Sequence, residues 1–461
     1  MKHIDCLLIA PSNPYSHALP YPYLGLCYLA GTLKARGIST EILDCSALKL
    51  KIVDVVNTVK KIKPRIIGIS AMSMNLRGCY QIIQSLKGNC RDIKIVVGGA
   101  HVNADQSIVG HMGLEYGFHG ESEFAFAEFC ERIIGGLAVN DISGLIVNDE
   151  GIITAQPPAI IDDLDELPPP AYELLPLDRY RSALSGLKTI SMITSRGCPY
   201  NCIFCSRTNK SRYRFLSVDK VVSQIQILVE RYGFEHIEFV DELFTLHNVR
   251  VMDICKRILE QKLNFTWSLL SRADKIDDEI LMTMKEAGCA RINLGVETGS
   301  ERVRFADNKK INNEKYIDAV KLCRKHGIKT NGFYILGHPS ETVQEMWQTV
   351  KFARQLNTDT FNINKMIPLP DSELYETAVA SGQLSSDVWR SFMLGERPHP
   401  IYYPEGVAPK VMDMIYVIGW LTFIVSPSKI LANLAIFFKP RLFYKTLKMI
   451  YVIIFGKRYD A

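Results

Sequence analysis

Several features that mark specialised classes of protein are missing from this sequence of 461 residues. No uninterrupted run of about eighteen apolar residues is present, so no transmembrane helix is expected. The start lacks the charged, apolar and small-residue regions of a secretory signal, and the expected location is cytoplasmic. The net charge is only +5, and no basic-aromatic patch or added RNA-binding region is visible. Nothing therefore predicts a nucleic-acid partner.

The whole chain contains twelve cysteines, which is too few for a scaffold that is stabilised by disulfides. A reducing compartment is the expected setting for such a protein. The composition, 47% hydrophobic and 22% charged, is that of a globular protein with substantial cores. A chain of this length is expected to form two or three domains.

Three of the cysteines lie close together as Cys198, Cys202 and Cys205, in a C-x3-C-x2-C pattern. Gly197 and Pro199 predict a turn at the start of this segment. Three thiolates suit a [4Fe–4S] cluster and leave one iron open to a small molecule. A zinc site and a merely buried group of thiols are the alternatives, although zinc sites more often pair C-x2-C knuckles with a fourth ligand.

Short β-type segments alternate with helical patterns over residues 1–137. The strands are predicted at residues 5–10, 39–44, 65–70, 94–97 and 116–120. This alternation predicts a doubly wound, flavodoxin- or Rossmann-like parallel sheet, whose ligand lies beyond the carboxyl ends of the strands. Those ends carry Pro11, Ser70, Gly98, Gly99, His101 and Gly120.

Residues 138–187 are predicted to be a linker, because the stretch 162–170 is rich in proline and acid. Residues 188–400 again alternate, with strands expected at 189–194, 237–240, 265–270, 291–295, 332–336 and 360–363. Six such units predict a partial (β/α)6, TIM-like barrel, with its chemistry at the carboxyl ends of the strands. The three cysteines directly follow the first of these strands.

Other predicted strand ends of the barrel carry polar groups. Asp241 and Glu242 are placed to accept hydrogen bonds from an ammonium group, and Glu297 and Ser300 from sugar hydroxyls or an amino acid moiety. Gly337 and Pro339 belong to a tight turn that is expected to expose backbone donors and acceptors. Capping of the next helix is the alternative role for the acidic residues.

Residues 401–461 are apolar, interrupted by proline and fringed with lysine and arginine. Two interpretations remain open for this C-terminal helical region. It either caps the barrel or lies against a membrane surface.

Taken together, the chain resembles the radical S-adenosylmethionine (SAM) superfamily, in the subgroup with an N-terminal cobalamin-binding domain. Cys198, Cys202 and Cys205 fall on that family's cluster ligands, and Phe204 on its aromatic position before the third cysteine. The resemblance implies three cofactors, a [4Fe–4S] cluster, SAM and cobalamin. It assigns SAM contacts to Asp241, Glu242, Glu297, Ser300, Gly337 and Pro339.

The resemblance also has two departures. In the turn 337–341, Ser340 replaces the second glycine of the family's G-x-P-G-E pattern. The D-x-H-x-x-G element that supplies an axial histidine in many cobalamin proteins is missing, which implies a corrinoid without histidine ligation. Pro11, Ser70, Gly98, Gly99, His101 and Gly120 are the residues expected near the corrinoid, with His101 as a neighbour and not a ligand.

The resemblance implies an enzyme that cleaves SAM reductively to a 5′-deoxyadenosyl radical and methylates an unactivated carbon through methylcobalamin. A small-molecule or lipid substrate and a flavodoxin- or ferredoxin-type reductant are the expected partners, with peripheral membrane contact through the tail. An oxidative cyclase of the anaerobic porphyrin type is the enzymatic alternative. A corrinoid- or cluster-binding sensor is the non-enzymatic one.

Overall fold

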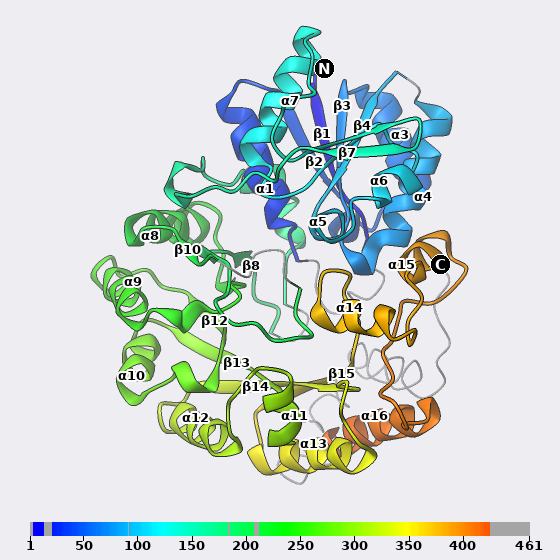
Figure 1. The fold of residues 1–461 in the computed structure, drawn as a ribbon. Coiled ribbons are helices and arrows are strands. Elements are labelled where there is room, and N and C mark those ends of the chain that lie inside the picture. Colours follow the sequence, from blue (N-terminus) through cyan, green and yellow to red (C-terminus); the bar gives the residue numbers. More distant parts are fainter. Residues whose placement is uncertain (1–2, 13–20, 91, 183–184, 207–211, 425–461) are drawn as a thin grey trace. The chain divides into compact units, whose positions relative to one another are not determined.

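The computed structural model describes residues 3–12, 21–90, 92–182, 185–206 and 212–424 (Figure 1). The chain forms two compact units. The first contains Met1–Leu270, Met282–Ala290 and Pro368–Pro400, and the second contains Ser271–Leu281, Arg291–Ile367 and Ile401–Ala461.

The first unit begins with the predicted doubly wound sheet. Its parallel strands run in the order β2-β1-β3-β4-β5. They are β1 (Cys6–Ala10), β2 (Thr40–Asp44), β3 (Ile66–Ser70), β4 (Lys94–Gly98) and β5 (Tyr116–Phe118). All five residues of β1 are buried, as expected for a central strand that is covered on both faces. The strand order reverses direction between β1 and β3, and such a switch point is where these sheets bind ligands.

Helices cover both faces of this sheet (Figure 1). Helices α1 (Leu24–Ala35) and α7 (Glu123–Gly135) pack together, as do α3 (Ile52–Ile62) and α4 (Leu76–Asn89). The short helices of this region are α2 (Cys45–Leu48), α5 (Ala100–Ala104) and α6 (Ile108–His111). Helix α3 buries one apolar stripe, formed by Val55, Val56 and Val59.

The sheet extends further along the chain than the sequence pattern predicted. Two antiparallel strands, β6 (Leu145–Asp149) and β7 (Ile152–Ala155), continue it beyond β5, inside the segment predicted to be a linker. Glu150 and Gly151 join them with φ angles of 48° and 96°. Two consecutive positive φ values match the twist of a tight β-hairpin, so this turn stabilises the pair. The prediction of a linker from residue 138 was therefore wrong for this part.

The first barrel strands also belong to the first unit. They are β8 (Thr189–Met192), β11 (His236–Phe239) and β12 (Thr266–Ser271), with β11 parallel to both neighbours. Helices α8 (Val218–Gln226), α9 (Asn248–Glu260) and α10 (Asp278–Glu286) alternate with the strands. Two helices that follow the last barrel strand, α14 (Glu373–Ala380) and α15 (Val388–Leu394), return to this unit, where α15 packs against α4.

The later barrel strands lie in the second unit. They are β13 (Cys289–Glu297), β14 (Lys329–Leu336) and β15 (Thr360–Lys365), again in parallel pairs. Their helices are α11 (Glu301–Ala306), α12 (Asn313–Lys325), α13 (Val343–Leu356) and α16 (Pro409–Ile424). The six strands have the sheet order β15-β14-β13-β12-β11-β8. This order confirms the predicted partial barrel.

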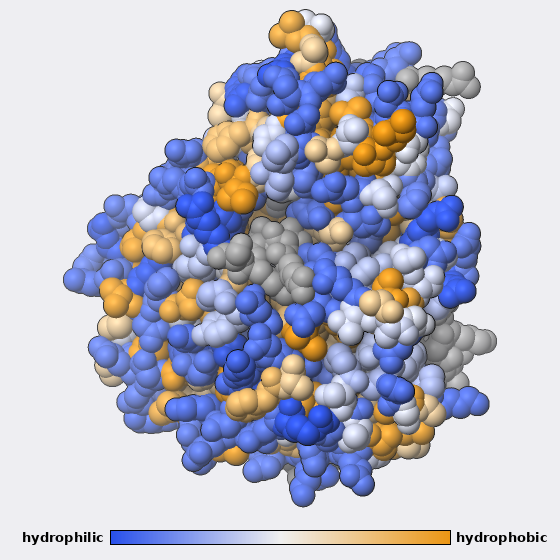
Figure 2. Space-filling model, viewed as in Figure 1, coloured by the Kyte–Doolittle hydropathy of each residue, from blue (hydrophilic) through white to orange (hydrophobic). Residues whose placement is uncertain are grey.

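The helix α16 packs against α13 and β15, as the cap interpretation predicted for this part of the tail. Among the described residues, no helix is both long and apolar enough to cross a membrane. Figure 2 shows that apolar residues on the visible face occur in separate small groups between hydrophilic ones. The predicted membrane contact would fall mainly on residues 425–461, which lie outside the described residues.

Candidate active site

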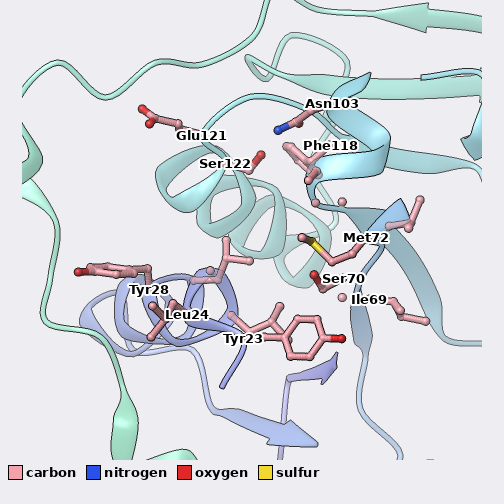
Figure 3. Close-up of a pocket in the computed structure, with 18 of the residues that line it drawn as sticks. Tyr23, Leu24, Tyr28, Ile69, Ser70, Met72, Asn103, Phe118, Glu121 and Ser122 are labelled. Atoms are coloured by element: carbon pink, nitrogen blue, oxygen red, sulfur yellow. The ribbon is translucent and has the colours of Figure 1, made fainter. Parts of the chain in front are cut away.

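A cavity of about 780 Å³ lies beyond the carboxyl ends of β3, β4 and β5, entirely within the first unit. This volume is typical of sites for large ligands, which range over roughly 300–1,000 Å³. Figure 3 shows the labelled side chains that surround the space, which come from α1 and the residue before it, the end of β3, α5, and the end of β5 with the segment after it. They are Tyr23, Leu24, Tyr28, Ile69, Ser70, Met72, Asn103, Phe118, Glu121 and Ser122.

Most residues predicted to contact cobalamin line this cavity. Ser70, Gly98, Gly99 and Gly120 are on its wall. Pro11 and His101 are not among the lining residues, although Pro11 follows β1 directly and its carbonyl accepts a 2.9 Å hydrogen bond from the Tyr23 hydroxyl.

Two of the glycines on the wall are required by the backbone. Gly99 has a φ of 107°, and a Cβ there would lie 2.9 Å from the Ala71 carbonyl oxygen. Gly120 has a φ of 81°, and a Cβ there would lie 2.7 Å from the Ala159 carbonyl oxygen. Only glycine adopts such angles without cost, and its missing side chain leaves the backbone bare to a ligand.

His101 is buried behind the cavity wall, in the first turn of α5. Its Nδ1 lies 3.0 Å from the Ser73 hydroxyl, and its ring meets the Trp389 ring at 5.5 Å, edge to face. Burial lowers the pKa of His101 to about 4, so the ring is neutral. These contacts support a packing role between α5 and α15.

The opposite wall of the same cavity comes from the barrel part of the first unit. This wall is formed by Ile193, Arg196, Ser206, Val240, Glu242, Leu369 and Asp371. Arg196 and Ser206 flank the three cysteines in sequence. The cavity is therefore bounded both by the strand ends of the N-terminal sheet and by the ends of the cysteine loop.

The cysteine loop leaves the barrel through a two-residue strand, β9 (Ser195–Arg196), which pairs with β10 (Arg214–Phe215). Gly197 has a φ of 91° and turns the chain into Cys198. The Cys205 N–H donates to the Cys202 carbonyl over 3.1 Å, which forms a further turn inside the loop.

The three thiols differ in exposure. Cys198 is half-buried, Cys202 is buried and Cys205 is exposed. The described residues hold no group of three or more acidic, cysteine or histidine side chains that converge on one metal ion. An iron–sulfur cube does not need such convergence, because each thiolate binds a different iron.

A second contact holds this loop at its base. Two hydrogen bonds join the loop to residues 371–374. The Leu374 N–H donates to the Ile203 carbonyl over 3.0 Å, and the Ser206 hydroxyl donates to Asp371 over 2.7 Å. The segment after the last barrel strand therefore anchors the cysteine turn.

Asp241 and Glu242 have different surroundings, although they are adjacent. Asp241 is fully buried, and its Oδ1 accepts hydrogen bonds from the Thr194 N–H, the Thr194 hydroxyl and the Ser195 hydroxyl at 3.1, 2.8 and 2.5 Å. Burial raises the pKa of Asp241. This carboxylate fixes the start of the cysteine loop, and it is not among the residues that line the cavity.

Glu242 does line the cavity. The surrounding protein raises the pKa of this carboxyl by desolvation, and the neighbouring Asp241 raises it further. Arg196 lowers it in part. Of the two predicted carboxylates, Glu242 is the one available to a ligand here.

The remaining predicted residues lie in the second unit, where Glu297 ends β13. A register shift interrupts the strand pairing between Gly295 and Glu297, and Glu297 itself has a φ of 65°. Such a conformation costs a non-glycine residue free energy and is often found at functional sites. The Lys309 ammonium donates to Glu297 Oε1 over 2.5 Å.

Ser300 and the turn 337–341 make internal contacts. The Ser300 hydroxyl accepts from the Val303 N–H as the N-cap of α11 and donates to Glu345 over 2.8 Å.

In the turn 337–341, the Gly337 and His338 N–H groups both donate to Glu341 Oε2, at 2.7 and 3.2 Å. The expectation of exposed donors was wrong for these two groups, because Glu341 satisfies them instead of capping α13. The next residue, Pro339, is half-buried, and Ser340 after it is exposed.

Eight of the nine cysteines outside the loop are buried, and Cys90 is half-buried. Burial raises the pKa of Cys45, Cys255 and Cys323 to about 12. The pKa values of Cys27, Cys79 and Cys130 are also raised, again mainly by burial.

Comparison with known proteins agrees with this arrangement. The family model of the radical SAM superfamily matches residues 192–353, and that of the B12 binding domain matches residues 17–130. An uncharacterized methyltransferase of Pyrococcus horikoshii is 34% identical over 85% of this chain and 87% of its own length. The chain belongs to the radical SAM superfamily. Within it, the chain falls in the subgroup with a cobalamin-binding domain.

Two more distant relatives of this radical SAM enzyme have different named activities. An anaerobic magnesium-protoporphyrin IX monomethyl ester cyclase of Rubrivivax gelatinosus is 27% identical over 77% of this chain and 66% of its own length. A cytidylyl-2-hydroxyethylphosphonate methyltransferase of Streptomyces wedmorensis is 24% identical over 83% of each chain.

A solved structure shares the fold of this radical SAM enzyme over most of its length. The methyltransferase TsrM of Kitasatospora setae superposes with a TM-score of 0.76 at 18% identity, covering 93% of this chain and 90% of its own.

Membership of this subgroup implies a [4Fe–4S] cluster, SAM and cobalamin as cofactors. The residues present fit these groups. One loop supplies three thiols, Glu242 offers a carboxylate, and the glycine-lined wall leaves room for a large flat ligand.

Sequence reasoning missed four charged residues of this site, Glu121, Glu123, Arg196 and Arg214. Glu121 and Glu123 follow Gly120 at the end of β5, and Arg196 stands two residues before Cys198. For these three, the position beside predicted site residues was a usable signal, but the pairing of all four was not visible in the sequence.

Proposed function

We propose that this radical SAM enzyme transfers a methyl group to an unactivated carbon of a small-molecule or lipid substrate. The observation that carries the proposal is the cavity that is bounded on one side by the cobalamin-binding domain and on the other by the ends of the cysteine loop. When bound, the cluster with SAM supplies a hydrogen-abstracting radical and cobalamin supplies the methyl group.

The chain's own residues have separate roles in this proposal. Cys198, Cys202 and Cys205 hold the cluster, and Glu242 accepts hydrogen bonds from the ammonium group of SAM. Glu297 binds the ribose or methionine end, a role consistent with its positive φ, since such conformations are often found at functional sites.

The other residues predicted to bind SAM act mainly by positioning. Asp241 holds the start of the cysteine loop, and Ser300 caps α11 behind Glu297. Gly337 fixes the turn that contains Pro339 through its bond to Glu341.

Bare glycines and apolar side chains of the N-terminal sheet form the remaining wall for cobalamin. Leu8, Ile69, Val96, Val97 and Phe118 contribute to this wall. An apolar wall excludes water, and exclusion of water protects a reactive intermediate from side reactions.

The relatives support methyl transfer as the outcome, since two of the three are named methyltransferases. The Rubrivivax cyclase keeps oxidative cyclisation as the second candidate. The two outcomes differ in whether the product gains a methyl group from methionine.

The test uses the full chain in an anaerobic host that is supplied with cobalamin and with methionine labelled in its methyl group. Untargeted mass spectrometry should reveal a metabolite that carries the labelled methyl only when the wild-type chain is expressed. Cys198→Ala should abolish it, while Cys90→Ala, outside the loop, should not.

The purified protein gives a second readout with reduced flavodoxin as the electron source. Methyl transfer predicts both S-adenosylhomocysteine and 5′-deoxyadenosine, whereas cyclisation predicts 5′-deoxyadenosine without transfer of label. A product that is altered but unlabelled would refute methyl transfer in favour of the cyclase.

A further inference from the structure

Four charged side chains with little exposure to solvent connect the cysteine loop to the rim of the cavity. Arg196 donates through Nη2 to Glu123 Oε1 over 2.6 Å, and its Nη1 lies 3.3 Å from Glu121 Oε1. Arg214 donates to both oxygens of Glu121, at 2.6 and 2.9 Å. The exposed fractions of these side chains are between 7% and 11%.

Arg196 contacts three different parts of the cobalamin-binding domain. Glu121 lies in the segment after β5, Glu123 begins α7, and the Tyr28 ring of α1 lies 5.4 Å from the guanidinium carbon. All four of these residues line the cavity. Figure 3 shows Tyr28 and Glu121 at the edge of the space.

The same arginine is part of the cysteine loop. Its backbone pairs with Arg214 in the two-residue ladder of β9 and β10, and only Gly197 separates it from Cys198. A movement of Cys198 is therefore transmitted to the guanidinium through one residue.

Glu121 and Glu123 depend on Arg196 to different degrees. Glu121 also binds Arg214 and accepts the Ile161 N–H over 2.7 Å. Glu123 is paired through Oε1 with Arg196, and its buried Oε2 has no hydrogen-bond partner among the described residues. A buried carboxylate that loses its only cation is left with an uncompensated charge, which favours rotation of the side chain toward water. For Glu123, the nearest open space is the cavity that it lines.

We propose that Arg196 is a positioning residue that couples assembly of the cluster to binding of the corrinoid. When the cluster fixes the cysteine loop, Arg196 holds Glu123 in the cavity wall and the cavity is preorganised for its ligand. When the loop is without its cluster, Glu123 is held less firmly and the cavity binds the ligand more weakly. This inference rests on the two cofactors and is independent of the methyl transfer proposed above.

The test measures the affinity for hydroxocobalamin by anaerobic equilibrium dialysis, with cobalt quantified by mass spectrometry. Each protein is measured twice, cluster-free and after reconstitution with iron and sulfide, and iron content is determined in parallel. For the wild type, we expect reconstitution to tighten the dissociation constant on the order of 10-fold, within the usual range for coupled sites.

Two variants should abolish the difference between the dissociation constants of the cluster-free and the reconstituted protein. Arg196→Met keeps the length of the side chain without its charge, and Glu123→Gln keeps the shape without the charge. In both, the dissociation constants of the two states should approach each other. The double variant should equal either single variant, because the two residues act as one pair.

Arg257→Met provides the matched control. It removes an arginine from the exposed ion pair with Asp219, and it should keep the wild-type ratio. Glu123→Gln leaves the cysteine loop unaltered, so it preserves the test if Arg196→Met does not fold. A wild-type protein with equal affinities, or a Glu123→Gln variant with the wild-type ratio, would overturn the proposal. Neither result would bear on methyl transfer, because no turnover is measured.

Discussion

The Asp241 carboxylate accepts a 2.8 Å hydrogen bond from the Thr194 hydroxyl and so joins the segment after β11 to the segment after β8. Ser195, the next residue, donates to the same oxygen. Since the cysteine loop starts here, Asp241 determines where the loop leaves the barrel.

Replacement of Asp241 by Ala should destabilise the protein and weaken its hold on iron. Ala removes the oxygen that accepts these hydrogen bonds and leaves buried donors of Thr194 and Ser195 unsatisfied, a loss of about 2 kcal/mol in the free energy of unfolding. Anaerobic urea denaturation and iron analysis after gel filtration measure both effects. Asp219→Ala, at an exposed carboxylate, is the control, and equal stability of the two variants would contradict the assignment.

Gly99→Ala and Gly98→Ala should differ, although the residues are neighbours. A methyl at Gly99 meets the Ala71 carbonyl at 2.9 Å on a backbone with positive φ, whereas one at Gly98 meets its nearest atom at 3.5 Å. We expect Gly99→Ala to lower the free energy of unfolding by roughly 1–3 kcal/mol and to weaken cobalamin binding. Gly98→Ala should change the stability little. Thermal unfolding and equilibrium dialysis would detect the difference, and similar results for both would argue against a steric cause.

Glu242→Gln should weaken SAM binding on the order of 10-fold, as expected when a charged hydrogen-bond acceptor is lost. Because desolvation raises the pKa of Glu242, its carboxylate forms only at a higher pH than that of an exposed glutamate. Wild-type affinity for SAM should therefore rise as the pH increases through this pKa. The variant should lack that rise. Dialysis against radiolabelled SAM across a pH series provides the measurement, and a rise that persists in Glu242→Gln would assign the titration to another group.

His338→Gln should change the pH dependence of stability. His338 is fully buried and bonded to Asp307; burial lowers its pKa, but the Asp307 carboxylate raises it more, so the net shift is upward. The raised pKa stabilises the folded state fully below the unfolded value of about 6.5, and this contribution is lost as the pH rises through the folded pKa. The stability difference between wild type and variant should thus shrink with increasing pH. Urea titrations at several pH values test this, with His326→Gln at a largely exposed partner, Asp278, as the control.

The strands and the turn before the cysteines were predictable because short local stretches of sequence determine both. Buried parallel strands read as short apolar runs, and β1, β3 and β4 lie within one residue of their predicted bounds. Gly197 and Pro199 predicted the turn at the start of the cysteine segment, and the φ of 91° at Gly197 is one that glycine adopts easily.

Contacts between distant segments could not be predicted in this way. Arg196 and Glu123 are 73 positions apart, and nothing in either local pattern relates them. Asp241 and Glu242 appeared equivalent in the sequence. Only the packed structure shows that one faces Thr194 and the other faces the cavity.

The hairpin of β6 and β7 was missed for a different reason. The acidic, proline-rich stretch 162–170 led to the prediction of a linker for all of residues 138–187. The two short strands before it were therefore included in the linker. The pair Glu150 and Gly151 was the local turn signal that would have separated them.

The raised pKa values of six buried cysteines outside the loop also bear on how the protein reacts with iron and with air. A thiol that keeps its proton at neutral pH is a poor nucleophile and a poor iron ligand. Iron supplied during maturation therefore meets little competition from Cys27, Cys45, Cys79, Cys130, Cys255 or Cys323. On exposure to air, damage should begin at the exposed Cys205, and the interior should remain chemically intact.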